Sequence, residues 1–277
     1  MTSRAAIPTL AATLLRLAML ALTLYGAVLG WLWFSQEKLL FVPTVLPADR
    51  PLAQAPDIHE VTIDVAGARL SALHLRLPNP KGVVFFLHGN GGSLESWFVN
   101  ADFHRRANFD LFMIDYRGYG KSTGRIESEA QLRQDVRSAW ATVAPRYAGK
   151  RVVIYGRSLG SGLAAGLSVE LASTRAPDLT VLVSPYSSMA ALSHDHYPWV
   201  PSFVLRYPMR TDQMVGHIGN PVLLIHGTED RLIAVAIAMP QGTGTARRPV
   251  AHRGRGCNDL QDFEAYRSGF ADALARL

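Results

Sequence analysis

The strongest constraint on the fold of this 277-residue chain is a series of short apolar runs that alternate with helical stretches. Continuous apolar runs are typical of strands buried on both faces, as in parallel sheets covered by helices. Two predicted helices, at 127–147 and 159–172, separate some of the runs. The pattern therefore predicts an α/β fold with a mostly parallel, doubly wound sheet. The predicted strands are 83–87, 111–114, 152–155, 180–183 and 222–225.

A different apolar pattern precedes these runs. Between Ile58 and Leu77 the apolar residues mostly alternate on either side of Ala66-Gly67-Ala68. Alternation indicates strands with one buried face, and the small residues favour a turn. We therefore expect an antiparallel hairpin at an edge of the sheet.

The N-terminal region carries an uncharged run at 17–34, which would span about 27 Å as a helix and so nearly match a bilayer core. Arg4 and Arg16 precede it, and Trp31 and Trp33 lie near its far end, where indole rings favour the membrane interface. Residues 1–35 are therefore interpreted as a cytoplasmic tip and transmembrane anchor, with the remainder outside, which in a bacterium is the periplasm. The alternatives are a buried core helix and a cleaved signal peptide, although a signal core is usually shorter and ends in small residues.

Composition and proline spacing set the remaining domain boundaries. Prolines at 43, 47, 51 and 56 favour a linker at 36–57, which leads into one domain at 58–277. The net charge is +6, but the basic residues are scattered, so we expect no nucleic-acid partner. Cys257 is the single cysteine of the sequence, so no internal disulfide can form.

The candidate nucleophile lies in the sequence Gly156-Arg157-Ser158-Leu159-Gly160. This stretch follows a predicted strand and opens a predicted helix, which is the setting that a nucleophile elbow requires. Glycine at both ends allows a sharp turn that pushes Ser158 outward. The alternative is a helix start of small residues capped by serine.

A glycine-rich loop, His88-Gly89-Asn90-Gly91-Gly92, follows another predicted strand. Its backbone should reach the same edge of the sheet, where Asn90 and Leu159 are expected to donate the hydrogen bonds of an oxyanion hole. A phosphate-binding loop is the alternative, but the lysine and serine or threonine of a Walker loop are missing.

Two further loops follow predicted strands. The glycine-broken sequence at 115–122 is expected to be structural, with Asp115 and Arg117 as buried or rim partners. The strand at 222–225 leads to Glu229 and Asp230, of which Asp230 is the favoured triad acid and Glu229 the second choice. Asp230 could instead serve only as a turn or helix-cap residue.

These motifs together resemble the α/β-hydrolase superfamily, specifically membrane-anchored serine hydrolases related to serine aminopeptidase-like domains, monoacylglycerol lipases and acyl-protein depalmitoylases. The resemblance covers most of 36–277 and implies the α/β-hydrolase fold with a small cap, here at 185–220. It also implies hydrolysis of esters, thioesters or amides of a small or lipid-like acyl substrate through an acyl-enzyme, without cofactor or metal. The matching segments are QEKLLFVP (36–43), HGNGG (88–92), DYRGYGKS (115–122), GRSLGSG (156–162), SPYSS (184–188) and HGTEDRLI (226–233).

One expected residue is missing. The resemblance implies a catalytic histidine in a GHND-like sequence before the last helix, but this chain has Cys257 there, in Gly256-Cys257-Asn258-Asp259. A thiol does not carry a proton near neutral pH as imidazole does. His252 is the nearest substitute. The other histidines near the predicted site are assigned to the cap, to a strand end or to the oxyanion turn: His194, His196, His217, His226 and His88.

The segment around Cys257 also lacks a recognisable pattern. Residues 241–257 contain four arginines and several glycines where a final buried strand is expected, and an apolar helical stripe then resumes from Leu260 to Leu277. One hypothesis is that 235–257 is translated from a shifted reading frame. Without a base the fold would persist as a binding module, which is the alternative function. The apolar residues of the cap suit either an acyl pocket or plain packing on the sheet.

Overall fold

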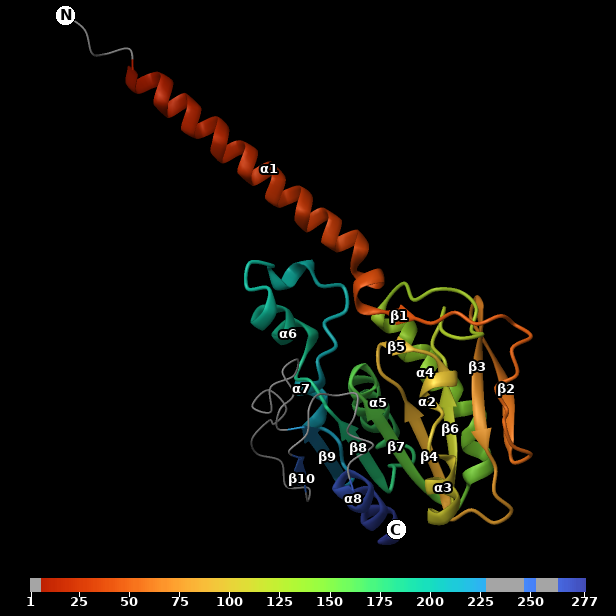
Figure 1. Ribbon diagram of the computed structural model, residues 1–277. Helices are drawn as coiled ribbons and strands as arrows, with labels where there is room; N and C mark the ends of the chain where they lie inside the picture. The colour runs from red at the N-terminus through yellow and green to blue at the C-terminus, as the bar shows by residue number, and fades with distance from the viewer. Residues whose placement is uncertain (1–5, 228–246, 253–263) are drawn as a thin grey trace, which may run out of the picture.

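A computed structural model describes residues 6–227, 247–252 and 264–277 of the chain. Their main feature is a sheet of eight strands in the order β10-β9-β8-β7-β4-β6-β3-β2 (Figure 1). The six strands from β10 to β6 are parallel, and helices connect most of them. The predicted α/β class with a mostly parallel, doubly wound sheet is confirmed.

The central strands are those predicted from the apolar runs. Each of β4, β6, β7 and β8 is buried along almost its whole length, as expected of strands covered on both faces. The bounds are β4 Gly82–Leu87, β6 Phe109–Ile114, β7 Arg151–Arg157, β8 Leu179–Val183 and β9 Val222–Gly227. A sixth parallel strand, β10 Arg247–His252, pairs with β9 inside the segment where the sequence showed no pattern.

The predicted edge hairpin is also confirmed. Strands β2 Ile58–Val65 and β3 Ala68–Leu75 are antiparallel, with β2 at the edge of the sheet. Gly67 provides the positive φ of 76° at the turn between them. The inner strand β3 pairs antiparallel with β6 and so joins the hairpin to the parallel strands.

Helices form an apolar core on each face of the sheet. One core contains side chains of α4 Glu129–Val143 and α5 Leu159–Leu171, which match the two predicted helices; α4 continues as the 3-10 turn η1 Ala144–Tyr147. The opposite core contains side chains of α2 Leu94–Trp97, α3 Ala101–Ala107 and the C-terminal α8 Glu264–Ala275.

The segment between β8 and β9 corresponds to the expected cap. It contains α6 Met189–His196, the 3-10 turn η2 Ser202–Val204 and α7 Thr211–Val215. Helix α7 contacts α5, whereas α6 and η2 extend away from the sheet toward α1 (Figure 1).

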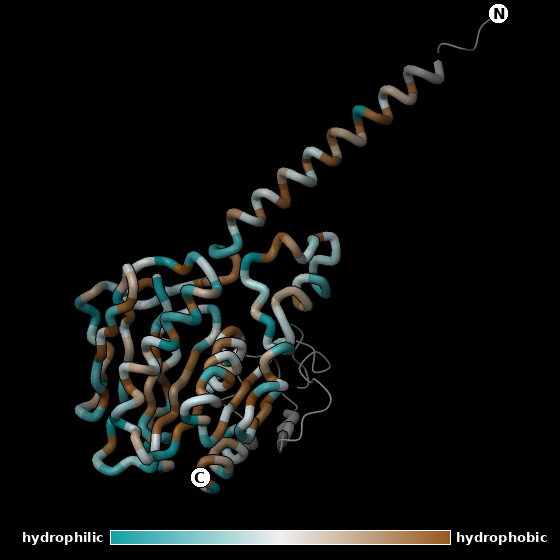
Figure 2. The backbone as a smooth tube through the Cα atoms, turned by 180° about the vertical axis from the view of Figure 1, so that it is seen from behind, coloured by the Kyte–Doolittle hydropathy of each residue, from teal (hydrophilic) through white to brown (hydrophobic). Residues whose placement is uncertain are grey.

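Helix α1 Ala6–Leu40 projects from the domain, and apolar residues recur along it (Figure 2). Its Leu10–Leu40 part is long and apolar enough to cross a membrane, and its most apolar stretch is not buried in the protein. The helix continues five residues into the stretch expected to be a linker, because Gln36 is buried against the cap. Strand β1 Val42–Pro43 follows and pairs with β5 Gly91–Gly92 of the glycine-rich loop.

Candidate active site

Ser158 lies on a sharp turn between β7 and α5, at the carboxyl edge of the sheet. Its backbone has φ 51° and ψ −120°, a strained conformation for a residue with a side chain. The N–H of Ser158 donates to the carbonyl of Val183 at 2.9 Å, and its carbonyl accepts the N–H of Ser161 at 2.8 Å. The fold thus holds Ser158 half-buried in the geometry of a nucleophile elbow.

The two glycines of the elbow leave no room for side chains. A Cβ at Gly156 would lie 2.2 Å from the carbonyl oxygen of Gly160, and a Cβ at Gly160 would lie 2.0 Å from the carbonyl oxygen of Leu87. Real Cβ atoms do not approach backbone so closely. The two glycines therefore meet two steric requirements. Gly156 allows the sharp turn, and Gly160 allows α5 to contact the end of β4.

The glycine-rich loop after β4 lies directly against the elbow. A Cβ built at Gly89 would be 3.6 Å from the Cβ of Ser158, so the loop backbone passes beside the serine. Leu159 is the first residue of α5, and N–H groups in the first turn of a helix have no intrahelical acceptor. The structure thus brings together Ser158, the loop that carries Asn90, and the N-terminus of α5.

Two tyrosine hydroxyls support the backbone of this loop. Tyr116 donates to the carbonyl of His88 at 2.8 Å, and Tyr119 donates to the carbonyl of Asn90 at 2.6 Å. The N–H of Val42 donates to the same Asn90 carbonyl at 2.9 Å. Burial raises the pKa of both tyrosines, so both hydroxyls keep the protons that they donate.

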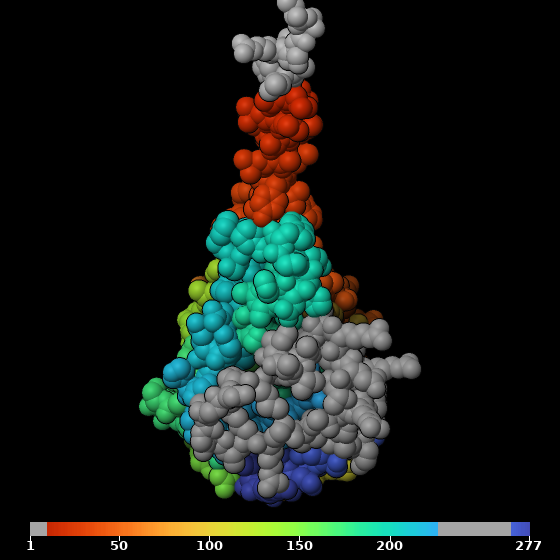
Figure 3. Space-filling view, turned by 90° about the vertical axis from the view of Figure 1, so that its left-hand side faces the viewer, coloured from red at the N-terminus to blue at the C-terminus, as the bar shows by residue number. Residues whose placement is uncertain are grey.

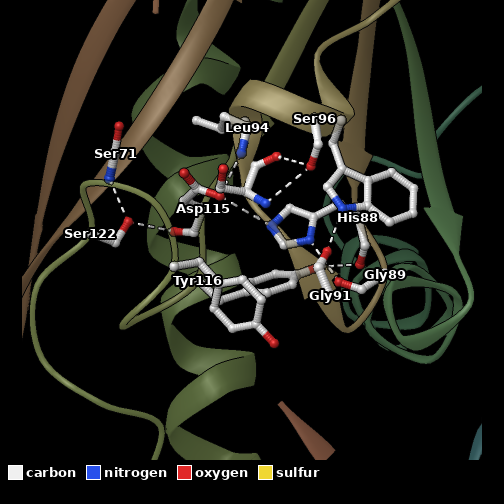
Figure 4. Close-up of polar contacts among 12 residues, drawn as sticks. Ser71, His88, Gly89, Gly91, Leu94, Ser96, Asp115, Tyr116 and Ser122 are labelled. Carbon is white, nitrogen blue, oxygen red and sulfur yellow. Dashed lines mark hydrogen bonds and ion pairs between the residues drawn. The ribbon is translucent and has the colours of Figure 1, made fainter. Parts of the chain in front are cut away.

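His88 and Asp115 form a buried pair beneath the loop (Figure 4). The His88 Nδ1 lies 2.7 Å from the carbonyl oxygen of Gly89, whereas its Nε2 lies 3.5 Å from Asp115 Oδ1, beyond ordinary hydrogen-bond length. Asp115 Oδ1 accepts the N–H of Leu94 at the start of α2. His88 thus lies in the glycine-rich turn, and the expectation that Asp115 is a buried structural partner agrees with these contacts, whereas the oxyanion role of the turn stays a prediction.

The same motif supplies a second buried pair. Arg117 donates to both carboxylate oxygens of Asp135 on α4, at 2.6 and 2.9 Å, and both side chains are buried. A bidentate pair of this kind fixes the loop at 115–122 against α4. Sequence reasoning missed Tyr116 and Tyr119 as supports of the glycine-rich loop; their place in a glycine-broken motif directly after a strand was the available signal.

A cavity of about 370 Å³ opens next to the elbow, between the sheet, α3 and α8. Arg157, which precedes Ser158, is buried in its wall with its guanidinium 5.4 Å from the ring centre of Trp97. The indole of Trp97 in turn donates to the carbonyl of Gly91 at 2.6 Å. Aromatic residues form much of the remaining wall: Phe86, Phe103, Tyr155 and Phe270.

The predicted acid and base fall at the ends of β9 and β10. Asp230, Glu229 and Cys257 lie outside the described residues, as does the side chain of His252. The backbone of His252 ends β10, paired with Gly227. Two strands, β8 and β9, lie between β10 and β7 in the sheet. At roughly 4.8 Å per strand, the backbone of His252 is therefore about 14 Å from β7, the strand that leads into the elbow.

The other candidate histidines lie where the sequence assigned them. His194 and His196 are exposed on α6 of the cap, and His217 is exposed, with its Nδ1 near the carbonyl of Gln213. His226 is buried near the end of β9. Among the described parts of the chain, no group of three or more His, Cys, Asp or Glu side chains is arranged to hold a metal ion.

Comparisons with known proteins show similarity to α/β-hydrolase domain proteins. A family model described as serine aminopeptidase, S33, matches residues 78–211. α/β-Hydrolase domain-containing protein 17B of Homo sapiens is 30% identical over 208 residues, which cover 72% of this chain and 69% of the relative. An uncharacterized protein of Mycobacterium tuberculosis is 29% identical over 254 residues, 87% of each chain.

Solved structures share the fold at lower identity. An esterase from Pyrococcus furiosus has a TM-score of 0.65 and 18% identity, covering 86% of this chain and 97% of its own. A soluble variant of monoglyceride lipase from Saccharomyces cerevisiae, in complex with a substrate analog, has a TM-score of 0.58 and 15% identity, covering 83% and 98%. These likenesses support the fold predicted from the sequence motifs.

Proposed function

Because this chain belongs to the α/β-hydrolase superfamily, among the serine aminopeptidase-like proteins and the relatives of α/β-hydrolase domain-containing protein 17, we propose that it is a serine hydrolase acting through Ser158. Its substrates would be acyl esters, thioesters or amides, cleaved through an acyl-enzyme. The observation that carries this proposal is the strained turn at Ser158, held against the glycine-rich loop.

In this mechanism the Ser158 Oγ attacks the acyl carbonyl carbon while a base removes the hydroxyl proton. The carbonyl electrons move to oxygen, and the N–H groups of Leu159 and Asn90 stabilise the resulting negative charge. The position of Leu159 at the N-terminus of α5 adds the positive end of the helix dipole. Collapse of the intermediate releases the alcohol, thiol or amine, and water then hydrolyses the acyl-enzyme.

The proposed acid is Asp230, and the proposed base is His252, the one histidine that follows Asp230 in the sequence. The distance of β10 from β7 argues against direct proton transfer from Ser158 to His252. Cys257 follows His252 by five residues in the sequence, at the position where the resemblance implies a histidine. This observation favours the second candidate function, a binding module that keeps the fold without the base.

Labelling with a fluorophosphonate probe tests the choice. We expect full-length protein to be labelled, Ser158→Ala to be unlabelled, and His252→Ala to lose labelling if His252 is the base. Cys257→His provides the complementary variant: it should raise the labelling rate if the missing imidazole limits the chemistry. An unlabelled wild type together with an unlabelled Cys257→His would exclude the enzyme and support the binding module.

The proposed enzyme is attached to a membrane by α1. Residues 1–35 would form a cytoplasmic tip and a span of the bacterial inner membrane, with the catalytic domain in the periplasm. The anchor would keep the cap and Ser158 near lipid-like acyl substrates. Cap residues such as Met189 and Leu192, which pack against the core on the elbow side, would line the acyl pocket.

A further inference from the structure

The cap carries three large aromatic side chains that the domain does not cover. Tyr197, Trp199 and Phe203 are 57%, 50% and 77% exposed; the first two lie between α6 and η2, and Phe203 lies in η2. We call residues 197–203 the cap tip. Exposed apolar groups gathered in one place indicate a surface that contacts something other than water.

The cap tip lies along the side of α1. The Tyr25 hydroxyl donates to the carbonyl of Trp199 at 2.8 Å, and the Gln36 side-chain amide donates to the carbonyl of Val204 at 2.7 Å. The cap therefore follows α1 from Tyr25 to Gln36, and the space-filling view shows it directly below the helix (Figure 3). Exposed aromatic residues of α1 lie at the same level: Trp31, Trp33 and Phe34.

Polar contacts mark the lower end of this shared surface. The Arg206 guanidinium pairs with Glu37 at 2.5 Å and lies 5.8 Å from the ring centre of Trp33. The backbone N–H of Arg206 donates to the Gln36 side-chain oxygen at 2.8 Å. Tyr207 donates to Glu37 at 2.9 Å. Charged groups thus begin where the apolar part of α1 ends, as at a membrane surface.

The length of α1 determines where a bilayer would meet the cap. A helix of about 20 residues crosses the hydrocarbon core, whereas the 35 residues of α1 would extend about 52 Å. The apolar run of the helix ends at Phe34, nine residues or about 13 Å past Tyr25. A bilayer that covers this apolar part therefore reaches the level of Trp199.

The backbone of the cap tip suits such an environment. Pro198 and Pro201 have no N–H groups, and the N–H groups of Tyr197 and Val200 donate to the carbonyls of Ser193 and Tyr197 at 2.7 and 2.9 Å. The Trp199 carbonyl accepts the Tyr25 hydroxyl. These contacts satisfy part of the cap-tip backbone and so lower the cost of placing the loop near lipid.

We propose that the cap tip is a membrane-docking surface, which places Tyr197, Trp199 and Phe203 in contact with the phospholipid bilayer that α1 crosses. The proposal rests on the membrane anchor of the proposed function and adds a second contact with the same leaflet. Docking holds the cap, and with it the approach to Ser158, at the lipid surface, where aromatic side chains are favoured.

The test uses the full chain with Cys257→Ser, which removes the only cysteine of the sequence. Single cysteines are introduced at three exposed positions and labelled with an environment-sensitive fluorophore: Phe203→Cys in the cap tip, Val28→Cys in α1 and Ser173→Cys beyond the end of α5. Each protein is placed in phosphatidylcholine nanodiscs with and without brominated acyl chains.

We expect bromine quenching and a blue shift of the label at 203 and at 28, with neither change at 173. Quenching at 28 but not at 203 would overturn the proposal and leave the anchor intact. An absence of quenching at both 28 and 203 would overturn the anchor together with the proposal. Equal quenching at all three positions would indicate nonspecific adsorption and would also overturn it.

Discussion

At the residue scale, the elbow depends on close backbone contacts at its two glycines. The Cα of Gly160 packs against the carbonyl groups of Leu87 and His88, at the end of the strand that leads into the glycine-rich loop. One glycine therefore determines how closely α5 approaches β4. Ser158 depends on this contact because it precedes α5 directly.

We predict that Gly160→Ala lowers the free energy of unfolding by about 1–3 kcal/mol, since the new methyl forces the backbone apart. Chemical denaturation in detergent measures the change. Gly219→Ala is the matched control, because a Cβ at this position would meet no neighbouring atom within 4 Å and the φ of Gly219 is not positive. Equal midpoints for the two variants would contradict the steric argument.

At the element scale, the loop after β4 is held by the loop after β6. The hydroxyls of Tyr116 and Tyr119 reach two successive parts of the glycine-rich loop, and β1 pairs with its far end. Two segments distant in sequence therefore fix one short backbone. Such fixed donors are what electrostatic stabilisation of an oxyanion requires.

Tyr119→Phe should slow fluorophosphonate labelling by about tenfold, which corresponds to about 1.4 kcal/mol of barrier. The loop would lose one of its two donors to Asn90 and with it part of its alignment. Tyr147→Phe is the control: this hydroxyl is equally buried but contacts His74 and Asp110 at the opposite end of the sheet. Labelling slowed equally in both variants would point to general destabilisation.

The packing of α3 against α8 predicts a pH dependence of stability. Burial lowers the pKa of His104 on α3 from 6.5 to about 3, so the folded protein keeps this ring neutral while the unfolded chain protonates it. Its contribution to stability is present above pH 6.5 and is lost as the pH falls from 6.5 toward 3.

As the pH falls from 6.5 toward 3, denaturation curves should therefore show a steeper loss of unfolding free energy for the wild type than for His104→Leu. The difference should reach a few kcal/mol over this pH range, at about 1.4 kcal/mol per pKa unit. The exposed His194 on α6 gives the matched variant, His194→Leu, which should retain the wild-type slope. Parallel slopes for the wild type and His104→Leu would show that His104 is not kept neutral.

At the scale of the whole molecule, α1 combines two roles. Its most apolar stretch is not buried against the domain, and its last part binds the cap through Tyr25, Gln36 and Glu37. The apolar helix and the domain are thus joined at the cap. In the proposed membrane anchoring, the helix would set the orientation of the domain toward lipid.

Removal of residues 1–24 should convert the protein from one that resists carbonate extraction to one that carbonate releases from membranes. The span would be lost, while the contacts from Tyr25 onward would remain. Detection of peptides from 1–24 in the mature full-length protein checks that the helix is retained. A shortened chain that still resists carbonate would show that another segment anchors the protein.

Local patterns in the sequence were enough to identify the central strands, the edge hairpin, the two long helices and the setting of Ser158. Burial on two faces gives continuous apolar runs, and these can be read without knowing the neighbours. Strand β10 could not be found this way, because Arg247 and Arg248 interrupt any apolar pattern and pairing with β9 defines the strand.

The sequence by itself therefore determined the fold class, the elbow and the apolar N-terminal helix, since each depends on residues close together in the chain. Only the tertiary structure brought Gly89 beside Ser158, placed Tyr119 on the glycine-rich loop and laid Trp199 against Tyr25, 174 residues away. The physical reason is that spacing along a chain reports local burial, whereas contacts between distant residues follow from the order in which strands assemble.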